Sequence, residues 1–420
     1  MTSWGLGPPV IALLVALGVL FMASPRLRTY AFTVWVFVFV AASMFYPAAF
    51  GTWFGADLKI LIVPLIQVIM FGMGTTLSLA DFGRVLAMPW PVLVGFVLQF
   101  SIMPCLGFAL ATAFGFEPEI AAGVVLIGSA PGGVASNVMT YLARANVALS
   151  VTMTACSTLA SPVMTPLMMK LLAGQYVPVD FWGMMVDICN MILVPLLAGL
   201  VANRVLYDRQ PLLRRASVLG GLGALSLAAA MAVGWLGADS LGGIRGGLVV
   251  GFLMFGVVVL AKLVVDVLLN GPEKWMDKAL PVVSMSGICF IIGIITARSA
   301  EPLRTVGLAL IAAAMLHNGL GYLLGYWGAR LCRLCEGDCR TVAIEVGMQN
   351  GGMASALAMN TLQSVKVALA PAIFGPWMNV SASVLATWWR RRPPEATVVQ
   401  REYAPVEIPS DEPARVAEEL

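Results

Sequence analysis

The chain has 420 residues, of which 60% are hydrophobic and 11% charged, and its net charge is only +3. So few charged side chains cannot cover the surface of a soluble protein of this size, and the mean hydropathy of +0.90 is typical of a chain that crosses a membrane many times. The composition therefore excludes a soluble globular protein and indicates an all-α polytopic membrane protein.

About thirteen apolar runs are long enough to cross about 30 Å of hydrocarbon as a helix. The runs are continuous, whereas a strand barrel needs short alternating segments. After residue 390 the sequence is rich in Pro and Glu and has no apolar period, which predicts a disordered cytoplasmic tail over 391–420. In chain order the runs lie near residues 7–24, 30–50, 58–79, 89–114, 118–144, 147–173, 180–203, 217–237, 246–269, 280–298, 303–328, 341–362 and 367–390.

Basic residues are shared unequally between the loops of the two faces. By the positive-inside rule the richer face is cytoplasmic, which predicts a multi-pass protein of the cell inner (plasma) membrane with a cytoplasmic C-terminus and an outside N-terminus. No basic residue precedes the first apolar run, so we expect a retained span rather than a cleaved signal peptide. The richer face receives Arg26, Arg28, Arg84, Arg144, Arg204, Arg209, Arg214, Arg215, Lys274, Lys278, Arg330, Arg333, Arg340, Arg390, Arg391 and Arg392, and the other face Lys59, Lys170, Arg245, Arg298, Arg304 and Lys366.

Two glycine-containing stretches interrupt the apolar runs. The first reads P-G-G-V-A-S-N and the second E-V-G-M-Q-N-G-G-M-A, and we expect the helices to break at Gly132–Gly133 and at Gly351–Gly352. The second stretch also places the carboxylate of Glu345 inside a span. Hydrocarbon tolerates broken helices and charges only where they line a cavity or a site. We therefore interpret the two breaks as facing halves of one binding site for ions and a solute.

The two stretches belong to an internal repeat. G-G-V-A-S at Gly132 recurs as G-G-M-A-S at Gly351, V-A-L-S at Val147 recurs as V-A-L-A at Val367, and L-G-F upstream matches L-G-Y. Seven spans separate the starts of the two units, near residues 89 and 303. An odd number means that the second unit enters the membrane from the opposite face. This is the inverted-topology repeat of secondary transporters, which places the binding site near the midplane between broken helices.

Side chains around the breaks carry the oxygen atoms that suit a hard cation. The structural alternatives to a binding site are that the glycines only allow close helix packing and that Ser150 bonds only to the backbone of its own helix. Gln99 is either an interhelical hydrogen bond or a ligand, His317 is expected to be a packing histidine, and Asp187 a structural carboxylate. One cage for a cation could be formed by Ser136, Asn137, Ser150, Thr154 and Glu345.

Other polar groups favour no enzymatic chemistry. No pair of nucleophile and base is evident, so we expect a protein that is not an enzyme. Cys332, Cys335 and Cys339 form C-x-x-C-x-x-x-C, but the second C-x-x-C of a zinc site is missing. Lys262 and Asp266, four residues apart, are expected to compensate each other's charge.

Long strings of the sequence resemble one transporter family. P-G-G-V-A-S-N-V-M-T-Y-L-A-R-A-N-V-A-L-S-V-T-M-T, E-V-G-M-Q-N-G-G and H-N-G-L-G-Y-L-L-G are similar to motifs of the bile acid:sodium symporter family. The resemblance implies ten helices, arranged as a panel domain and a core domain of two inverted units whose broken helices cross. It covers about residues 30–204 and 276–389, so three spans, 7–24, 217–237 and 246–269, are additional. We expect these extra spans at the periphery, against the panel or at an oligomer contact.

The resemblance also implies roles for individual residues. It places two co-transported Na⁺ ions, the only metal expected, and a substrate between core and panel. Val134 stands where members commonly carry Thr or Ser, and Met378 where some carry His, so the resemblance does not fix the identity of the substrate. The implied first sodium site is Ser136, Asn137, Ser150, Thr154 and Glu345; the second is Gln99, Glu345, Val346, Met348 and Gln349; the substrate site is Gly133, Val134, Asn350 and Asn379.

From these observations we expect a sodium-coupled symporter that imports an organic anion, either bile-acid-like or a small carboxylate such as pantoate or a keto acid, by alternating access. The alternatives are a proton-coupled or uncoupled transporter and a non-transporting sensor on the same fold; a nucleic-acid partner is not expected. The expected organisation is an extra span in 1–29, panel helices in 30–79, 180–203 and 278–299, core repeats in 89–173 and 303–390, and a basic loop with an inserted two-helix hairpin in 204–277.

Overall fold

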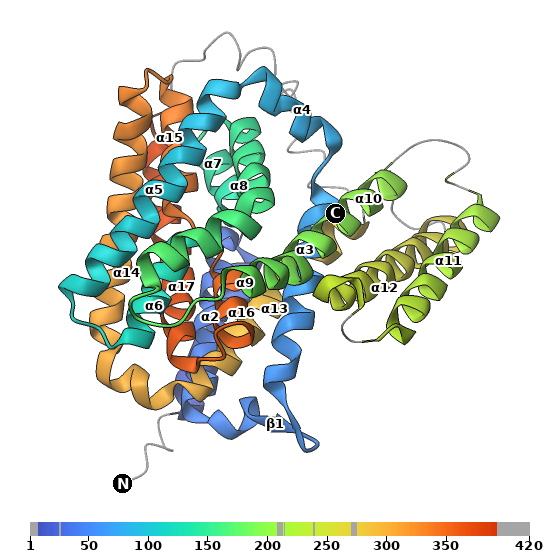
Figure 1. Ribbon diagram of the computed structural model, residues 1–420, viewed down its shortest axis with the longest axis horizontal. Helices are drawn as coiled ribbons and strands as arrows, with labels where there is room; N and C mark the ends of the chain where they lie inside the picture. Colours follow the sequence, from blue (N-terminus) through green and yellow to red (C-terminus); the bar gives the residue numbers. More distant parts are fainter. Residues whose placement is uncertain are drawn as a thin grey trace.

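The computed structural model describes residues 7–24, 27–207, 213, 215–237, 240–269 and 275–392, and the expected C-terminal tail lies outside the described residues apart from Arg391 and Arg392. The described chain is almost entirely helical (Figure 1). Within the described ranges, eight helices are long and apolar enough to cross a membrane, and shorter apolar helices accompany them. Each of the thirteen expected runs contains helix, so the protein is a polytopic α-helical membrane protein, as predicted.

The first elements form a pair of long helices followed by a short hairpin. Helix α2 ends just before Pro47, because the helical conformation is unfavourable for the residue that precedes a proline. The strands β1 and β2 pair antiparallel, and Phe54 and Gly55 in the turn between them have positive φ. These elements are α1 (Gly7–Ala23), α2 (Arg28–Phe45), η2 (Pro47–Phe50), β1 (Thr52–Trp53), β2 (Ala56–Asp57), η3 (Leu58–Leu61), α3 (Ile62–Thr76) and α4 (Leu79–Ala87).

Two three-part units follow the same order of a long helix, a broken helix and another long helix. In the first unit the break covers residues 130–134. In the second the extended residues are Met348 to Asn350, and α16 already begins at Gly351, so the expected break at Gly351–Gly352 was wrong by a few residues. The Asn350 side chain caps α16 by accepting a hydrogen bond from the Met353 amide, which starts the helix there. The first unit is α5 (Pro89–Ala113), α6 (Pro118–Ser129), α7 (Ala135–Leu142), α8 (Val147–Met168) and η4 (Met169–Ala173), and the second is α14 (Ala300–Leu331), α15 (Glu336–Gly347), α16 (Gly351–Asn360) and α17 (Val365–Arg390).

Polar contacts at both ends show how the inverted units hold each other. The residue that caps the third helix of each unit donates a hydrogen bond to an acid in the first turn of the other unit's broken helix. Ser364 donates to Glu119 at 2.7 Å, and Asn146 donates to Asp338 at 2.8 Å. The two contacts are related by the inverted repeat, so the units are fastened at both ends.

A second group of helices packs beside these units. It consists of α2 and α3 together with α9 (Phe181–Ile188), η5 (Cys189–Leu193), α10 (Val194–Tyr207) and α13 (Trp275–Arg298). Helices α3 and α10 approach most closely at Gly74 and Gly199, where a Cβ on either glycine would overlap a carbonyl oxygen of the other helix.

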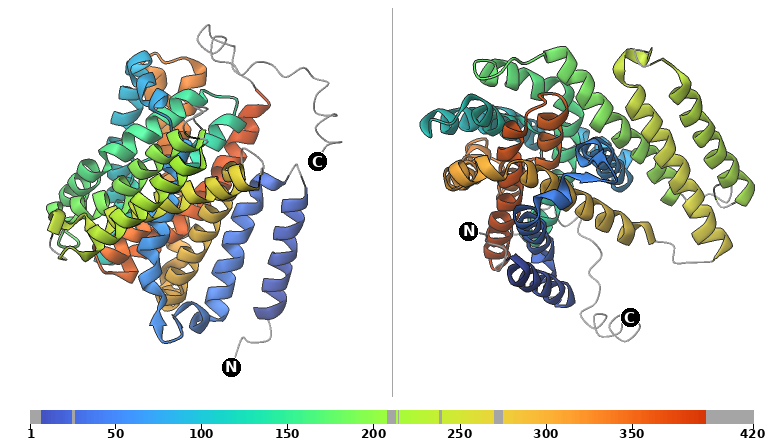
Figure 2. Two further views of the ribbon diagram at one scale, coloured as in Figure 1. Left: turned by 90° about the vertical axis from the view of Figure 1, so that its right-hand side faces the viewer. Right: turned by 90° about the horizontal axis from the view of Figure 1, so that it is seen from below.

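The three additional spans lie on the outside of this second group. Helix α1 packs along α2, with Gly7 under the Phe45 ring and Gly18 under the Trp35 ring. Helices α11 (Ala216–Trp235) and α12 (Arg245–Lys262), with η7 (Ser240–Gly243) between them and η8 (Leu263–Leu268) after them, form a hairpin that extends from the body of the molecule and contacts α10 through α12 (Figures 1 and 2).

Lys262 and Asp266 have partners in other elements. The Lys262 ammonium donates to the carbonyl oxygens of Val205 and Leu206 at 2.6 and 2.9 Å, at the end of α10. The Asp266 carboxylate accepts a hydrogen bond from the Trp275 indole at 3.1 Å. A lysine amine on the last carbonyls of a helix is a favourable cap. The expected mutual compensation of the two charges therefore gives way to contacts with α10 and α13.

We expect Gly199→Ala to lower the stability of the protein, because its Cβ would overlap the Phe71 carbonyl oxygen and force α10 away from α3. Overpacking of this kind costs about 1–3 kcal/mol. The control is Gly221→Ala in α11, where no atom lies within 4 Å of the added Cβ. Thermal unfolding of the purified variants in detergent measures both effects, and equal melting temperatures would contradict the close approach.

Candidate functional site

The two breaks cross each other and pair through their main chains. Gly132 and Gln349 form an antiparallel β-bridge. The Gly133 amide donates to the Met348 carbonyl at 2.9 Å, and the Asn350 amide donates to the Pro131 carbonyl at 2.8 Å. Backbone groups that leave a helix inside a membrane need such partners. The crossing therefore satisfies both breaks and holds the four helix ends together.

Glycine is required on one side of the crossing because other atoms come close. A Cβ on Gly132 would lie 2.7 Å from Oε2 of Glu345, and a Cβ on Gly133 would lie 2.9 Å from the Gln349 carbonyl oxygen. Close packing and a polar site are therefore both served by the same glycines.

The Glu345 carboxylate lies at the crossing and is only 1% exposed. It accepts hydrogen bonds from Ser136 at 2.5 Å, from Thr154 at 2.9 Å and from Ser150. Within the described part of the chain its side-chain partners are these hydroxyls, and the ion pairs found there do not include it. A buried carboxylate held by neutral donors alone is costly unless a cation completes its surroundings.

The structure brings all five residues of the expected first cage together. Besides Glu345 and its three hydroxyl donors, Asn137 joins through its amide oxygen, which accepts from Ser150 at 2.8 Å and from Thr154 at 3.5 Å. The five residues come from α7, α8 and α15. Hydroxyl, amide and carboxylate oxygens converge on one point, which is the donor set that a hard cation prefers.

A second group of oxygens lies on the other side of Glu345. Gln99 in α5 donates to Gln349 Oε1 at 2.5 Å and to the Ala130 carbonyl at 3.1 Å, and Gln349 donates to the Val346 carbonyl at 2.5 Å. The Oε1 atom of Gln99 is buried and has no hydrogen-bond partner among the residues that the structure describes. An unpaired buried acceptor costs about 1–3 kcal/mol, so this oxygen is one that a bound cation would satisfy.

A small cavity adjoins the unpaired oxygen. It measures about 10 Å³, and Gln99, Ser157 and Glu345 are among its lining residues. This space holds about one water-sized sphere. Ser157 accepts from the Gly132 amide at 3.2 Å and donates to the Thr154 carbonyl at 3.1 Å. The sequence analysis missed Ser157; the signal was its spacing of three residues from Thr154 on one helical face.

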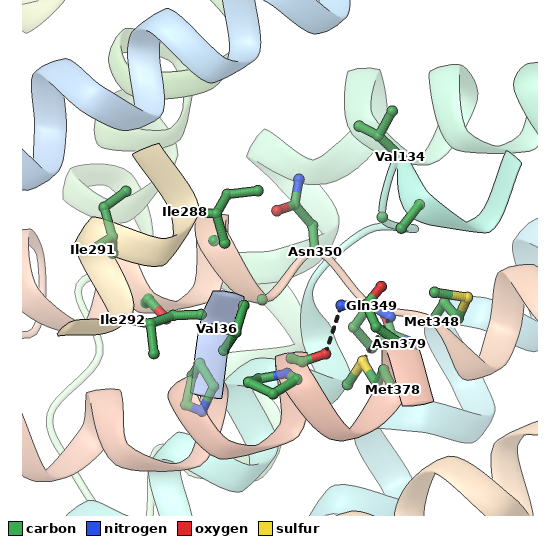
Figure 3. A pocket seen from close by; sticks show the side chains of 18 of the residues that line it. Val36, Val134, Ile288, Ile291, Ile292, Met348, Gln349, Asn350, Met378 and Asn379 are labelled. Carbon is green, nitrogen blue, oxygen red and sulfur yellow. Dashed lines mark hydrogen bonds between the residues drawn. The ribbon is translucent and has the colours of Figure 1, made fainter. Parts of the chain in front are cut away.

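A larger cavity of about 110 Å³ opens on the opposite side of the crossing (Figure 3). The four expected substrate residues, Gly133, Val134, Asn350 and Asn379, all line it. In Figure 3 the Asn350 side chain lies between Ile288 on one side and Val134 on the other. The structure therefore places the expected substrate residues on one wall.

The two walls of this cavity differ in chemistry. The wall from α2, α3 and α13 is apolar and includes Val36, Ile69 and Ile292. The wall from the crossing carries the amides of Asn350 and Asn379 and the N-termini of α7 and α16. Within the described part of the chain, the buried Asn350 Nδ2 group has no hydrogen-bond partner. Helix N-termini and a free amide donor favour an anionic group. The described lining residues include no Lys, Arg or His.

The remaining polar residues of the sequence analysis have local partners. His317 bonds to the Met103 carbonyl at 3.0 Å and packs on Phe374, as expected of a packing histidine. Asp187 accepts from Thr361 at 2.7 Å and fastens the end of α16. Cys339 donates to the Leu334 carbonyl. Among the residues that the structure describes, no cluster of three or more His, Cys, Asp or Glu side chains is suited to hold a metal ion.

Inverted units with crossed broken helices and a buried carboxylate held by hydroxyl groups are typical of ion-coupled membrane transporters. A family model described as the Sodium Bile acid symporter family matches residues 63–238. The "Uncharacterized sodium-dependent transporter YocS" of Bacillus subtilis is 35% identical over 86% of this chain and 91% of its own length. The "Probable sodium/metabolite cotransporter BASS1, chloroplastic" of Arabidopsis thaliana is 30% identical over 87% of this chain and 74% of its own. The chain belongs to the sodium bile acid symporter family.

Comparison with solved structures supports the fold. The sodium proton antiporter MjNhaP1 of Methanocaldococcus jannaschii aligns with 92% of this chain and 98% of its own, at a TM-score of 0.51 and 13% identity. The predicted fold class, an inverted-repeat transporter with crossed broken helices, is therefore confirmed. Like its family and relatives, the protein is a sodium-dependent multi-pass membrane transporter and not an enzyme.

We expect Thr154→Val to lower the free energy of unfolding by about 2 kcal/mol, because a buried charged acceptor loses one of its donors. Thr158→Val is the matched control, since Thr158 lies one turn further along α8 and donates only to the Thr154 carbonyl, at 2.7 Å. Melting temperatures in detergent compare the two variants. Equal losses would show that the contact with Glu345 carries no special weight.

Proposed function

We propose that this protein is a symporter that imports a small organic anion together with two sodium ions by alternating access. The observation that carries the proposal is the Glu345 carboxylate, which lies buried at the crossing of two broken helices and is bonded there by hydroxyl groups. A cation bound beside this carboxylate would neutralise it and replace hydrogen bonds by oxygen ligation.

The first ion would bind among Ser136, Asn137, Ser150, Thr154 and Glu345. Their oxygens already point at one another, with the Ser136 and Thr154 hydroxyls 3.4 Å apart. On ion binding each hydroxyl would turn its hydrogen outward and present a lone pair. Because the residues belong to α7, α8 and α15, this ion would tie the two inverted units together.

The second ion would bind among the side chains of Gln99, Gln349 and Glu345 and the carbonyl groups of Val346 and Met348. Support comes from the unpaired Gln99 Oε1 atom and from the adjoining cavity of about 10 Å³. The Met348 carbonyl also accepts the Gly133 amide from the other break. An ion here would therefore stiffen the crossing beside the substrate wall.

The substrate would be a compact carboxylate such as pantoate or a keto acid. A cavity of about 110 Å³ is well below the roughly 300–1,000 Å³ of pockets that enclose drug-sized ligands, so it favours a small acid over a bile-acid-like steroid. The carboxylate would accept from the Asn350 side-chain amide and from the main-chain amide of Val134 at the start of α7. The aliphatic body would contact the opposite apolar wall. Val134 in place of a hydroxyl residue removes one hydrogen-bonding group from this wall of the cavity.

Transport would follow from movement of two bodies past this cavity. The core would be residues 89–173 and 303–390, and the panel 30–79, 180–203 and 278–299. The substrate would lie between them, and both ions would order the wall that the core provides. Rocking would then be favourable only with ions and substrate all bound or all absent. By the positive-inside rule the C-terminus would lie in the cytoplasm, and an inward sodium gradient across the plasma membrane would drive import.

We expect Glu345→Gln to abolish sodium-dependent uptake, because the neutral amide removes the charge that attracts the ions. A screen of small carboxylates for sodium-dependent thermal stabilisation identifies the substrate, and uptake into proteoliposomes with an inward sodium gradient measures transport. The control is Glu117→Gln, an exposed carboxylate paired with Lys366. Uptake by the unaltered protein that is the same without sodium would overturn the coupling, and binding without counterflow would indicate a sensor.

Asn350 offers a test of the substrate group that leaves the helix cap in place. We expect Asn350→Asp to raise the KM for the carboxylate by more than tenfold, because aspartate retains the oxygen that caps α16 but replaces the free amide donor by a negative charge. Sodium-dependent stabilisation without substrate should change little. Asn350→Ser, which also retains a cap, is the control without the added charge. An unchanged KM in Asn350→Asp would remove Asn350 from the substrate site.

A further inference from the structure

The inserted hairpin encloses an apolar trough together with α10. The trough measures about 560 Å³, with α12 as its floor and α10 and α11 as its sides. In Figure 1 the three helices lie side by side at the right of the molecule, away from the crossing. Leu197 and Val201 of α10, Leu222, Leu225 and Ala229 of α11 and Phe252 of α12 are among the lining residues.

Contacts at both ends hold the hairpin to α10, so the trough is a lasting feature. At one end the side-chain oxygen of Asn190, in the π-helical turn η5 before α10, accepts the Gly247 amide in the first turn of α12. At the other end Lys262 of α12 donates to the last carbonyls of α10. Between these ends the Gly251 Cα lies beside Ala198. Helix α12 is thus held against α10 along its length.

The lining of the trough is almost entirely apolar, which suits contact with hydrocarbon chains. Leu225 is 68% exposed, Val201 57% and Leu197 42%, yet these side chains lie in the middle of membrane-spanning helices. The one hydroxyl in the lining, that of Ser226, donates to the Phe252 carbonyl at 2.7 Å. The lining therefore favours apolar contacts, and its hydroxyl group is already hydrogen-bonded within the protein.

Two exposed arginines stand at one end of the trough. Arg204 follows Val201 by three residues on α10, and Arg215 precedes Leu222 by seven residues at the start of α11, so both continue the lining by helical spacing. From Arg215 to Ala229 is 14 residues, or about 21 Å of helix. This matches one leaflet, whose hydrocarbon and headgroup layers together are about 20–22 Å thick.

We propose that the trough binds one phospholipid with an anionic headgroup. Its acyl chain would fill the groove between α10 and α11, and its phosphate would accept hydrogen bonds from Arg204 and Arg215. The lipid would complete the packing between the hairpin and α10. The proposal concerns the inserted hairpin and is independent of the ion and substrate sites.

Native mass spectrometry of the full chain, released from mild detergent with added phosphatidylglycerol or phosphatidylcholine, tests the proposal. We expect one phosphatidylglycerol retained per chain and little phosphatidylcholine. The double variant Arg204→Gln/Arg215→Gln should weaken retention about thirtyfold, since each arginine near anionic lipid contributes about fivefold to sixfold. The control is Arg390→Gln, another exposed arginine on the same basic face.

A second variant separates the acyl chain from the charge. Ala229→Trp places a large ring in the trough and should remove the bound lipid with the arginines intact, whereas Leu308→Trp, at an exposed position on α14, should not. Equal retention by all variants would overturn the proposal. So would a mass of two chains without lipid in the unaltered protein, because a second copy would then cover the trough.

Discussion

The structure depends on one constraint, a carboxylate that must be buried in the middle of a membrane protein. Glu345 is surrounded by the hydroxyl groups of three residues on two other helices. Desolvation makes a buried carboxylate costly. The arrangement is tolerable only if the donors are held in place and a cation can join them. The crossing, the glycines beside it and the capping of α16 by Asn350 all place main-chain groups and side chains around this carboxylate.

Fastening of the two inverted units follows from the same requirement. Ser364 with Glu119 and Asn146 with Asp338 join a helix cap of one unit to an acid in the first turn of the other unit's broken helix. A negative charge near a helix N-terminus is favourable, so each contact stabilises two helix ends at once. The cavity wall from α2, α3 and α13 is apolar and holds no residue of the expected ion sites.

Two facing helix breaks could be predicted from the residues, and the family resemblance implied that they cross, but several details followed from the structure alone. The second break was predicted at Gly351–Gly352, whereas Asn350 caps the helix just before them. Lys262 and Asp266 were predicted to compensate each other's charge. In the structure Lys262 donates to a carbonyl group of α10, and Asp266 accepts from Trp275. Ser157 was missed because a serine within an apolar helix usually bonds only to its own backbone. For Lys262, Asp266 and Ser157 a residue from another element decided the contact, whereas Asn350 caps α16 locally.

By itself the sequence determined that the chain is a helical membrane protein with an inverted repeat, since apolar run length, charge asymmetry and recurring glycine motifs are local or periodic properties. It also singled out Glu345, because a charge within an apolar run is unfavourable wherever the run lies. The grouping of Ser136, Ser150 and Thr154 with that carboxylate was also predicted, and the hydrogen bonds agree with it. Only the tertiary structure decided that Ser157 joins the crossing and that the inserted hairpin forms a trough against α10. The physical reason is that such contacts join residues far apart in sequence, whose distances are set by helix packing.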